Sequence, residues 1–323
     1  MVWTAGTSLY GDRYRIQYEL GRGRFGTTYL ASDRNSQPVV IKTLSDRAHP
    51  DRDRLQQLFV QGAFKLAKCQ HPHIVKAWEP FQEGGIWCIP MEYIDGFSLA
   101  RRARAILPEE KALQYIRQIG EALIEVHRNG LLHRDIRPGN ILLRGGEADA
   151  VLIDFDLAMD FDHELTVTRT AELMKGFAAL ELYSRSAQRG PFTDIYSLGA
   201  TLYALLTGET PVSADERKIS GTPLVPPQEY NSNISDRVNR AILWAMKLEA
   251  EDRPQSVEEW LSELGLREEV PSTPVNFTQP RRFNWSLFWT AVGAIGTLLA
   301  GLAVIPPLIE MWRNDSTPTP VIS

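Results

Sequence analysis

The spacing of apolar residues changes near residue 96, and this change divides the first 265 residues into two regions. In the first region, the segments 14–18 and 28–31 alternate apolar and polar residues, and 39–41 is a short run of β-branched residues. Patterns of this kind predict β-strands. Residues 55–68 instead have the spacing of an amphipathic helix. The first region is therefore predicted to be rich in β-structure, with a helix over 55–68.

Helical spacing dominates after residue 96. Pro108, Glu109 and Glu110 are typical of a first helical turn, where proline is tolerated and acidic side chains face the positive end of the helix dipole. Apolar residues then recur at helical spacing as far as Gly130, and these are Leu113, Ile116, Ile119, Leu123 and Val126. A small β-rich lobe followed by a larger helical lobe predicts an α+β fold with a cleft between the lobes.

The segment 286–309 contains 24 residues, none of them charged. A helix of that length spans about 36 Å, which exceeds the roughly 30 Å hydrocarbon core of a bilayer. Trp285, Trp289 and Trp312 lie near its ends, where their rings favour the headgroup level. The alternative is a buried core helix, but few helices of that length lack a polar face. We expect one transmembrane helix over 285–310.

Charges beside this segment predict its orientation. Arg281 and Arg282 precede the span, and basic residues favour the cytoplasmic side. We therefore expect a single-pass protein of the inner cell membrane, with residues 1–284 in the cytoplasm and 311–323 as a short external tail. Residues 266–284 are expected to be a linker, because Pro, Ser, Thr, Asn and Gln dominate its centre. The N-terminus does not have the pattern of a signal peptide.

Composition narrows the possible functions. The net charge of −5 argues against a nucleic-acid partner, because binding to phosphates requires a basic excess. The two cysteines, Cys69 and Cys88, are not in a C-x-x-C pair, so neither a disulfide framework nor a zinc site is expected. This cysteine content fits a reduced, cytosolic environment.

Residues 21–26 have the pattern G-x-G-x-x-G, formed by Gly21, Gly23 and Gly26. The pattern also occurs in dinucleotide-binding folds, but there a helix follows immediately. Here the segment 27–30 continues as a strand, so we favour a β-hairpin flap over phosphates. Glycines in such a flap let backbone N–H groups approach phosphate oxygens without Cβ clashes.

Further side chains are suited to phosphoryl transfer. Lys42 follows the β-branched run and could reach phosphates as a point cation, although a single lysine is more often a solvated surface residue. Asp135 could accept a hydroxyl proton, and Asn140 and Asp154 could hold a metal ion. These residues together predict phosphoryl transfer, because that reaction depends mainly on positioning and charge neutralisation.

Residues 14–264 resemble a bacterial Hanks-type serine/threonine protein kinase. The motifs occur in the family's order: the glycine-rich segment 20–30, the strand 39–42, the segment 71–75, the hinge at 91–93, the catalytic loop 133–140, the metal motif 154–155, the helix 194–199, and Arg253, which is expected to pair with Glu181. The resemblance implies a bilobal protein kinase fold, with an N-lobe over 14–92 and a C-lobe over 97–265 after an N-terminal extension over 1–13.

The resemblance also implies roles for the site residues. Asp135 would orient the substrate hydroxyl and accept its proton. Arg137, where the family usually has lysine, would neutralise the transferring phosphoryl group. Asn140 and Asp154 would hold Mg²⁺ or Mn²⁺. The residues expected to bind ATP are Leu20, Gly21, Gly23, Gly26, Lys42, Glu92 and Ile94, the last two through backbone groups that face adenine. The implied partners are ATP and protein substrates.

Lys42 lacks the helix carboxylate with which the family's lysine forms an ion pair. Gly62 stands at that position, and no acidic residue occurs between Arg54 and Trp78. Glycine also weakens a helix by about 1 kcal/mol relative to alanine. An alternative partner for Lys42 is Asp154, and such a pair would compete with the metal.

Other departures lie after the metal motif. Asp156 replaces a glycine and would restrict backbone freedom. Leu180 replaces the proline before Glu181, and Lys175 stands where a threonine often precedes the glycine. The last change puts recognition of the substrate hydroxyl in doubt.

The segment 154–181 resembles an activation segment. Thr166, Thr168 and Thr170 lie in its middle, and Arg134 could bind a phosphate placed on one of them. The alternative is a polar loop of unmodified threonines.

These observations leave alternative functions. The first is a membrane-tethered protein serine/threonine kinase, based on Lys42, Asp135, Asn140 and Asp154. The second is a pseudokinase scaffold or regulator with weak catalysis or none, based on Gly62 and on the Asp at 156. A small-molecule kinase of similar fold is a variant of the first.

Overall fold

The computed structural model describes residues 3–22, 26–44, 52–101, 105–145, 149–155, 176–184 and 186–267. The chain divides into two compact units, residues 1–269 and 270–323, and all the described residues belong to the first. Among the described residues, no helix is both long and apolar enough to cross a membrane. The predicted transmembrane helix over 285–310 lies outside the described residues, as do its flanking arginines and the tail. So do Gly23, Asp156, Lys175 and the threonines at 166, 168 and 170.

Six antiparallel strands form the sheet of the N-lobe, in the order β1-β2-β3-β4-β6-β5. The strands are β1 (Ser8–Leu9), β2 (Tyr14–Arg22), β3 (Thr27–Asp33), β4 (Pro38–Thr43), β5 (Phe81–Glu83) and β6 (Ile86–Glu92), and helix α1 spans Arg52–Lys68. The alternating segments of the sequence fall in β2 and β3, and the β-branched run falls in β4. Phe59, Ala63 and Leu66 of α1 are buried, as their helical spacing predicts. The N-lobe is therefore β-rich with one described helix, as expected.

Residues before the first predicted strand are part of the N-lobe sheet. Leu9 is buried and β1 pairs with β2. The ring of Tyr10 stacks on Phe81 of β5, with 4.6 Å between centroids, and its backbone N–H donates to the Glu83 carboxylate at 2.7 Å. Since β1 and β5 are the two edges of the sheet, the segment predicted as an N-terminal extension links both edges.

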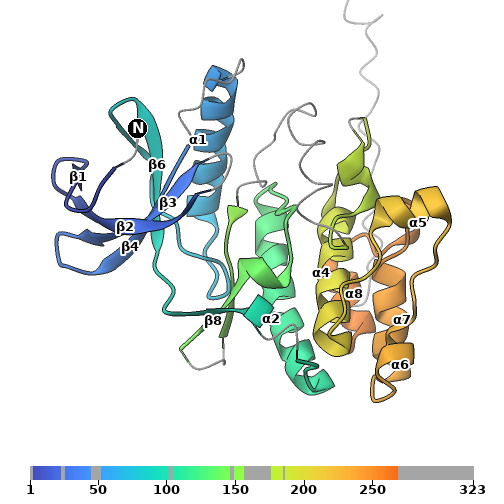
Figure 1. Cartoon of the computed structure of the whole chain (residues 1–323). Coiled ribbons are helices and arrows are strands. Elements are labelled where there is room, and N and C mark those ends of the chain that lie inside the picture. The colour runs from blue at the N-terminus through green and yellow to red at the C-terminus, as the bar shows by residue number, and fades with distance from the viewer. Residues whose placement is uncertain are drawn as a thin grey trace, which may run out of the picture. The chain divides into compact units, whose positions relative to one another are not determined.

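Helices form most of the C-lobe (Figure 1). They are α2 (Glu109–Arg128), α4 (Pro191–Thr207), α5 (Ala214–Ser220), α6 (Pro227–Tyr230), α7 (Asp236–Ala245) and α8 (Val257–Glu263). Every residue of α4 from Thr193 to Thr207 is buried, and α2, α7 and α8 pack against it. The apolar stripe predicted for α2, from Leu113 to Val126, faces this core. The central position of α4 therefore explains why it has no polar face.

A small antiparallel sheet carries the predicted active-site loops on the C-lobe. Its strands are β7 (Gly96–Ser98), β8 (Ile141–Arg144) and β9 (Asp149–Leu152), in the order β7-β8-β9. Short 3₁₀ helices lie at Leu99–Arg101, Pro138–Asn140, Leu180–Tyr183 and Ala250–Asp252. Asn140 directly precedes β8, and Asp154 lies two residues after β9. The sheet thus places two residues that are distant in sequence at neighbouring strand ends.

Candidate active site

The strands on either side of the glycine-rich segment form a β-hairpin. Arg22 of β2 pairs with Thr27 of β3, and β3 continues directly as a strand. A Cβ at Gly26 would lie 1.6 Å from the carbonyl oxygen of Thr43, so no side chain fits there. The Thr43 hydroxyl accepts from the Thr27 N–H at 3.2 Å and donates to its carbonyl at 3.0 Å. The strand after the glycines favours the flap over a dinucleotide fold. Contact of Gly21 and Gly26 with phosphates stays a prediction.

Lys42 forms an ion pair with the Asp154 carboxylate. The lysine lies on β4 and its side chain is 11% exposed, whereas that of Asp154 is 35% exposed. Gly62 lies on α1 and offers no carboxylate. The predicted alternative partner of Lys42 is therefore the observed one.

Asp154 and Phe155 have opposite environments. The φ angle of Asp154 is +66°, a left-handed conformation that aspartate adopts more readily than most residues. Phe155 is buried, and its ring meets the His133 ring edge to face at 4.6 Å. This packing fixes Phe155 in the core, so Asp154 is held where its carboxylate meets Lys42.

Asp135 is held by two side chains of its own loop. The Asn140 amide donates to the Asp135 carboxylate and to its backbone carbonyl, both at 2.8 Å. The Nε of Arg137 lies 3.0 Å from the other carboxylate oxygen of Asp135, as an ion pair without hydrogen-bond geometry. Burial raises the pKa of Asp135, and Arg137, His133 and Asn140 oppose this shift. A raised pKa suits a carboxylate that has to accept a proton.

The buried carboxylate of Asp194 supports the backbone of the catalytic loop. Asp194 of α4 accepts the backbone N–H groups of His133 at 2.9 Å and Arg134 at 2.7 Å, and it contacts His127 Nε2 at 2.8 Å. Burial alone would raise the pKa of Asp194, but His127, His133 and the Arg134 N–H outweigh it and the pKa is lowered. The φ angle of Arg134 is +65°, a strained value that these bonds hold in place. The resemblance placed Asp194 at the start of the helix 194–199, but the sequence gave no signal for its contact with His127.

The donor set suits a magnesium ion only in part. Because the side-chain amide nitrogen of Asn140 donates hydrogen bonds to Asp135, the side-chain carbonyl oxygen is the atom that Asn140 can offer to a cation. Asp154 adds a carboxylate, and Mg²⁺ prefers oxygen ligands from one or two side chains plus phosphates and water. No group of three or more His, Cys, Asp or Glu in the described part of the chain could hold a metal. The residues therefore fit Mg²⁺ bound together with a nucleotide, provided that Lys42 releases Asp154.

The predicted adenine-binding segment is anchored by contacts that the sequence did not indicate. The Glu92 N–H donates to the Lys76 carbonyl at 2.9 Å, so this N–H does not serve adenine in the present conformation. The Glu92 side chain forms an ion pair with Arg144 at 3.0 Å. Leu20 is 45% exposed on β2, while Ile94 is buried. Adenine binding by the Glu92 carbonyl and by Ile94 stays a prediction.

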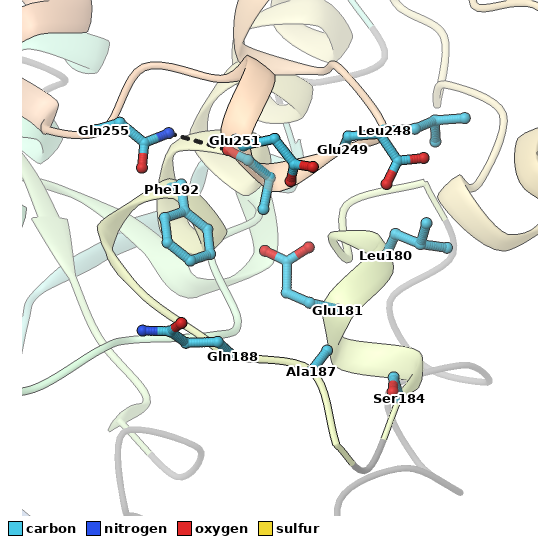
Figure 2. A pocket seen from close by; sticks show the side chains of 11 residues that line it. Leu180, Glu181, Ser184, Ala187, Gln188, Phe192, Leu248, Glu249, Glu251 and Gln255 are labelled. Atoms are coloured by element: carbon cyan, nitrogen blue, oxygen red, sulfur yellow. Dashed lines mark hydrogen bonds between the residues drawn. The ribbon is translucent and has the colours of Figure 1, made fainter.

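Glu181 and Arg253 form the ion pair that the sequence predicted. Two guanidinium nitrogens meet the two carboxylate oxygens at 2.8 and 3.0 Å, and both side chains are buried. Arg253 also donates to the carbonyls of Lys247, Leu248 and Phe192. Glu181 lines a pocket of about 560 Å³ together with Leu180, Phe192 and Leu248, and Figure 2 shows these side chains. The replacement of proline by Leu180 has not disturbed this pair.

The fold and the site define the class of protein. The sequence profile of the family described as protein kinase domain matches residues 14–263, and the chain belongs to this family. It is 32% identical to a probable serine/threonine-protein kinase of Clostridium acetobutylicum over 80% of this chain and 40% of that protein. It is 31% identical to the serine/threonine-protein kinase PknB of Mycobacterium leprae over 78% of this chain and 42% of that protein. The chain thus spans less than half the length of these curated relatives.

Solved structures agree with this assignment. The PpkA-294 apo form is 28% identical with a TM-score of 0.66, covering 81% of this chain and 99% of that one. The kinase domain of Mycobacterium tuberculosis PknI is 24% identical with a TM-score of 0.63, covering 82% of this chain and 98% of that one. The second likeness concerns the fold alone.

Proposed function

We propose that this chain is an ATP-dependent protein serine/threonine kinase, which transfers the γ-phosphoryl group of ATP to Ser or Thr hydroxyls. The observation that carries this proposal is the arrangement around Asp135. Asn140 binds one of its carboxylate oxygens and Arg137 lies against the other. A carboxylate held in this way, with a raised pKa, is prepared to orient a hydroxyl and accept its proton.

The remaining site residues would neutralise the negative charge of the phosphates. The Arg137 side chain is 37% exposed and would neutralise the transferring phosphoryl group from beside Asp135. Lys42 would bind phosphate oxygens, and the hairpin at Gly26 would cover them. Asn140 and Asp154 would hold Mg²⁺, which supplies Lewis-acid stabilisation of the phosphates when bound.

Lys42 has to leave Asp154 before it can bind a nucleotide. Asp154 cannot serve both Lys42 and a metal ion fully, so movement of Lys42 to phosphate oxygens is a separate step for this chain. Since α1 has no carboxylate at position 62, or at any position after Arg54, to receive the lysine, this step lowers the rate without removing any group that acts on the substrate. The same ion pair is the observation that favours the second candidate, a pseudokinase that binds nucleotide weakly and acts as a scaffold or regulator.

One experiment separates the two candidates. The purified full-length chain is incubated with radiolabelled ATP, Mg²⁺ and a generic protein substrate. We expect label on protein Ser or Thr, and at least a hundredfold less in Asp135→Asn, given the usual contribution of a general base. No transfer by the wild type, together with thermal stabilisation by ATP, would instead assign a nucleotide-binding pseudokinase.

We further propose that a helix over 285–310 anchors the chain in the inner cell membrane, with the kinase domain in the cytoplasm. The support is the uncharged segment preceded by Arg281 and Arg282. After cell lysis, we expect the full-length chain in the membrane fraction and resistant to carbonate extraction. Deletion of residues 285–323 should move it to the supernatant, and a soluble full-length chain would refute the anchor.

A further inference from the structure

The chain crosses from the N-lobe to the C-lobe between the end of β6 and the start of β7. Glu92 is the last residue of β6 and pairs with Val39 of β4, so it belongs to the N-lobe sheet. Arg144 is the last residue of β8, and β8 begins directly after Asn140. The ion pair between Glu92 and Arg144, at 3.0 Å, therefore joins the two lobes where the chain passes between them.

Each partner of this pair is fixed on its own lobe. Glu92 exchanges contacts with Lys76: its N–H donates to the Lys76 carbonyl at 2.9 Å, and its carboxylate accepts the Lys76 N–H at 3.4 Å. Arg144 pairs with Gly96 in the β7–β8 ladder and with Asp149 in the β8–β9 ladder. Movement of one lobe relative to the other at this point would therefore have to break the ion pair.

A second contact involves Asp95, near the C-terminal end of the segment 92–96 that connects the two lobes. The Gly145 N–H donates to the Asp95 carbonyl at 3.2 Å. A Cβ at Gly96 would lie 2.0 Å from the Leu143 carbonyl oxygen, so the backbones approach closely there. Residues 143–145 thus contact both ends of the segment 92–96, in which Glu92 and Ile94 are predicted to bind adenine.

We infer that Arg144 is a positioning residue for the nucleotide: through Glu92 it keeps the adenine-binding segment in register with Asn140, which lies four residues before it and directly precedes its strand, β8. The inference rests on the proposed function, since it assumes that ATP binds between these elements. The side chains are 40% and 28% exposed, so the pair is screened by water and its effect is modest. Both side chains also line a cavity of about 510 Å³.

The test uses the full-length chain and a fluorescent ATP analogue with Mg²⁺. Arg144→Met and Glu92→Gln should each weaken nucleotide binding about three- to fivefold, as expected for a part-exposed ion pair. The charge-swapped double variant Glu92→Arg/Arg144→Glu should recover most of this loss. The matched control is Lys218→Met, which breaks a similar exposed pair with Glu249 and should leave binding unchanged.

Two further readouts distinguish positioning from a general loss of structure. In Arg144→Met the KM for ATP should rise while kcat stays within about twofold, and the difference from wild type should vanish near 1 M salt, where the Debye length falls to about 3 Å. Unchanged binding in Arg144→Met, or a loss in the control of the same size, would overturn the inference.

Amide hydrogen exchange, measured without nucleotide, distinguishes failure of the proposed function from failure of this inference. Faster exchange at 94–96 in Arg144→Met, with no nucleotide binding by the wild type, would refute ATP binding and leave the lobe contact standing. Unchanged exchange at 94–96 would refute the contact itself.

Discussion

Two ion pairs of the molecule, Glu181–Arg253 and Lys42–Asp154, differ in burial and in the number of hydrogen bonds that support them. Glu181 and Arg253 are 6% and 0% exposed, meet through two hydrogen bonds, and receive further support from three backbone carbonyls. Lys42 and Asp154 are 11% and 35% exposed, and Asp154 is also the predicted metal ligand. The first pair is a buried structural contact, whereas the second would have to open for the proposed function.

The difference between the two ion pairs shows where this chain departs from the pattern of the protein kinase family. The described part of the C-lobe keeps its supporting contacts, from the buried Asp194 under the catalytic loop to the Glu181–Arg253 pair. The departure that alters the contacts of Lys42 lies in the N-lobe, where α1 carries Gly62 instead of an acidic side chain. A chain with a preserved support for Asp135 and an altered partner for Lys42 is expected to retain the chemistry at a reduced rate.

Breaking the buried pair should have the largest effect on stability. Arg253→Met leaves the Glu181 carboxylate buried without its partner, which should lower the free energy of unfolding by about 3–5 kcal/mol. Urea denaturation of the full-length chain measures this value. Lys218→Met, which breaks the exposed pair with Glu249, should cost less than about 1 kcal/mol. Equal losses of unfolding free energy in the two variants would contradict the distinction between the buried and the exposed ion pair.

The lowered pKa of Asp194 predicts a pH dependence of stability. A carboxylate with a depressed folded-state pKa stabilises the fold above its unfolded pKa of about 3.9, and this contribution is lost as pH falls through the folded pKa. Asp194→Asn should therefore be less stable than wild type by roughly 2–3 kcal/mol at neutral pH, because charged hydrogen bonds to two backbone N–H groups are weakened. Denaturation curves between about pH 7 and pH 2 should converge at the acid end. A constant difference would show that the carboxylate charge is not responsible.

Lys42→Met should separate stability from function. Since the pair with Asp154 is part-exposed, its loss should change the free energy of unfolding by less than about 1 kcal/mol. The affinity for nucleotide should fall strongly, because Lys42 is the predicted phosphate ligand. Thermal unfolding with and without ATP and Mg²⁺ measures both quantities. A large loss of stability without nucleotide would mean that the Lys42–Asp154 contact is structural.

Local sequence patterns predicted the elements, and the resemblance to the family predicted the long-range pair between Glu181 and Arg253. The strands β2, β3 and β4 and the helices α1 and α2 follow directly from apolar spacing. The contacts of β1 with the sheet edge, of His127 with Asp194 and of Glu92 with Arg144 were not foreseen. Each joins residues whose local pattern is ordinary, so only the folded arrangement brings them together. The pairing of Lys42 with Asp154 was foreseen as an alternative, because the absence of acidic residues near Gly62 is visible in the sequence.

The most direct test of the account is the rate of phosphoryl transfer by Gly62→Glu relative to wild type, measured on the full-length chain with saturating ATP and Mg²⁺. A carboxylate at position 62 should draw Lys42 away from Asp154 and increase the rate by about tenfold, equivalent to about 1.4 kcal/mol of barrier. Both proteins should lose transfer when Asp135→Asn is added. An unchanged rate, or no transfer by either protein, would contradict the claim that this site is a kinase centre slowed by its Lys42–Asp154 pair.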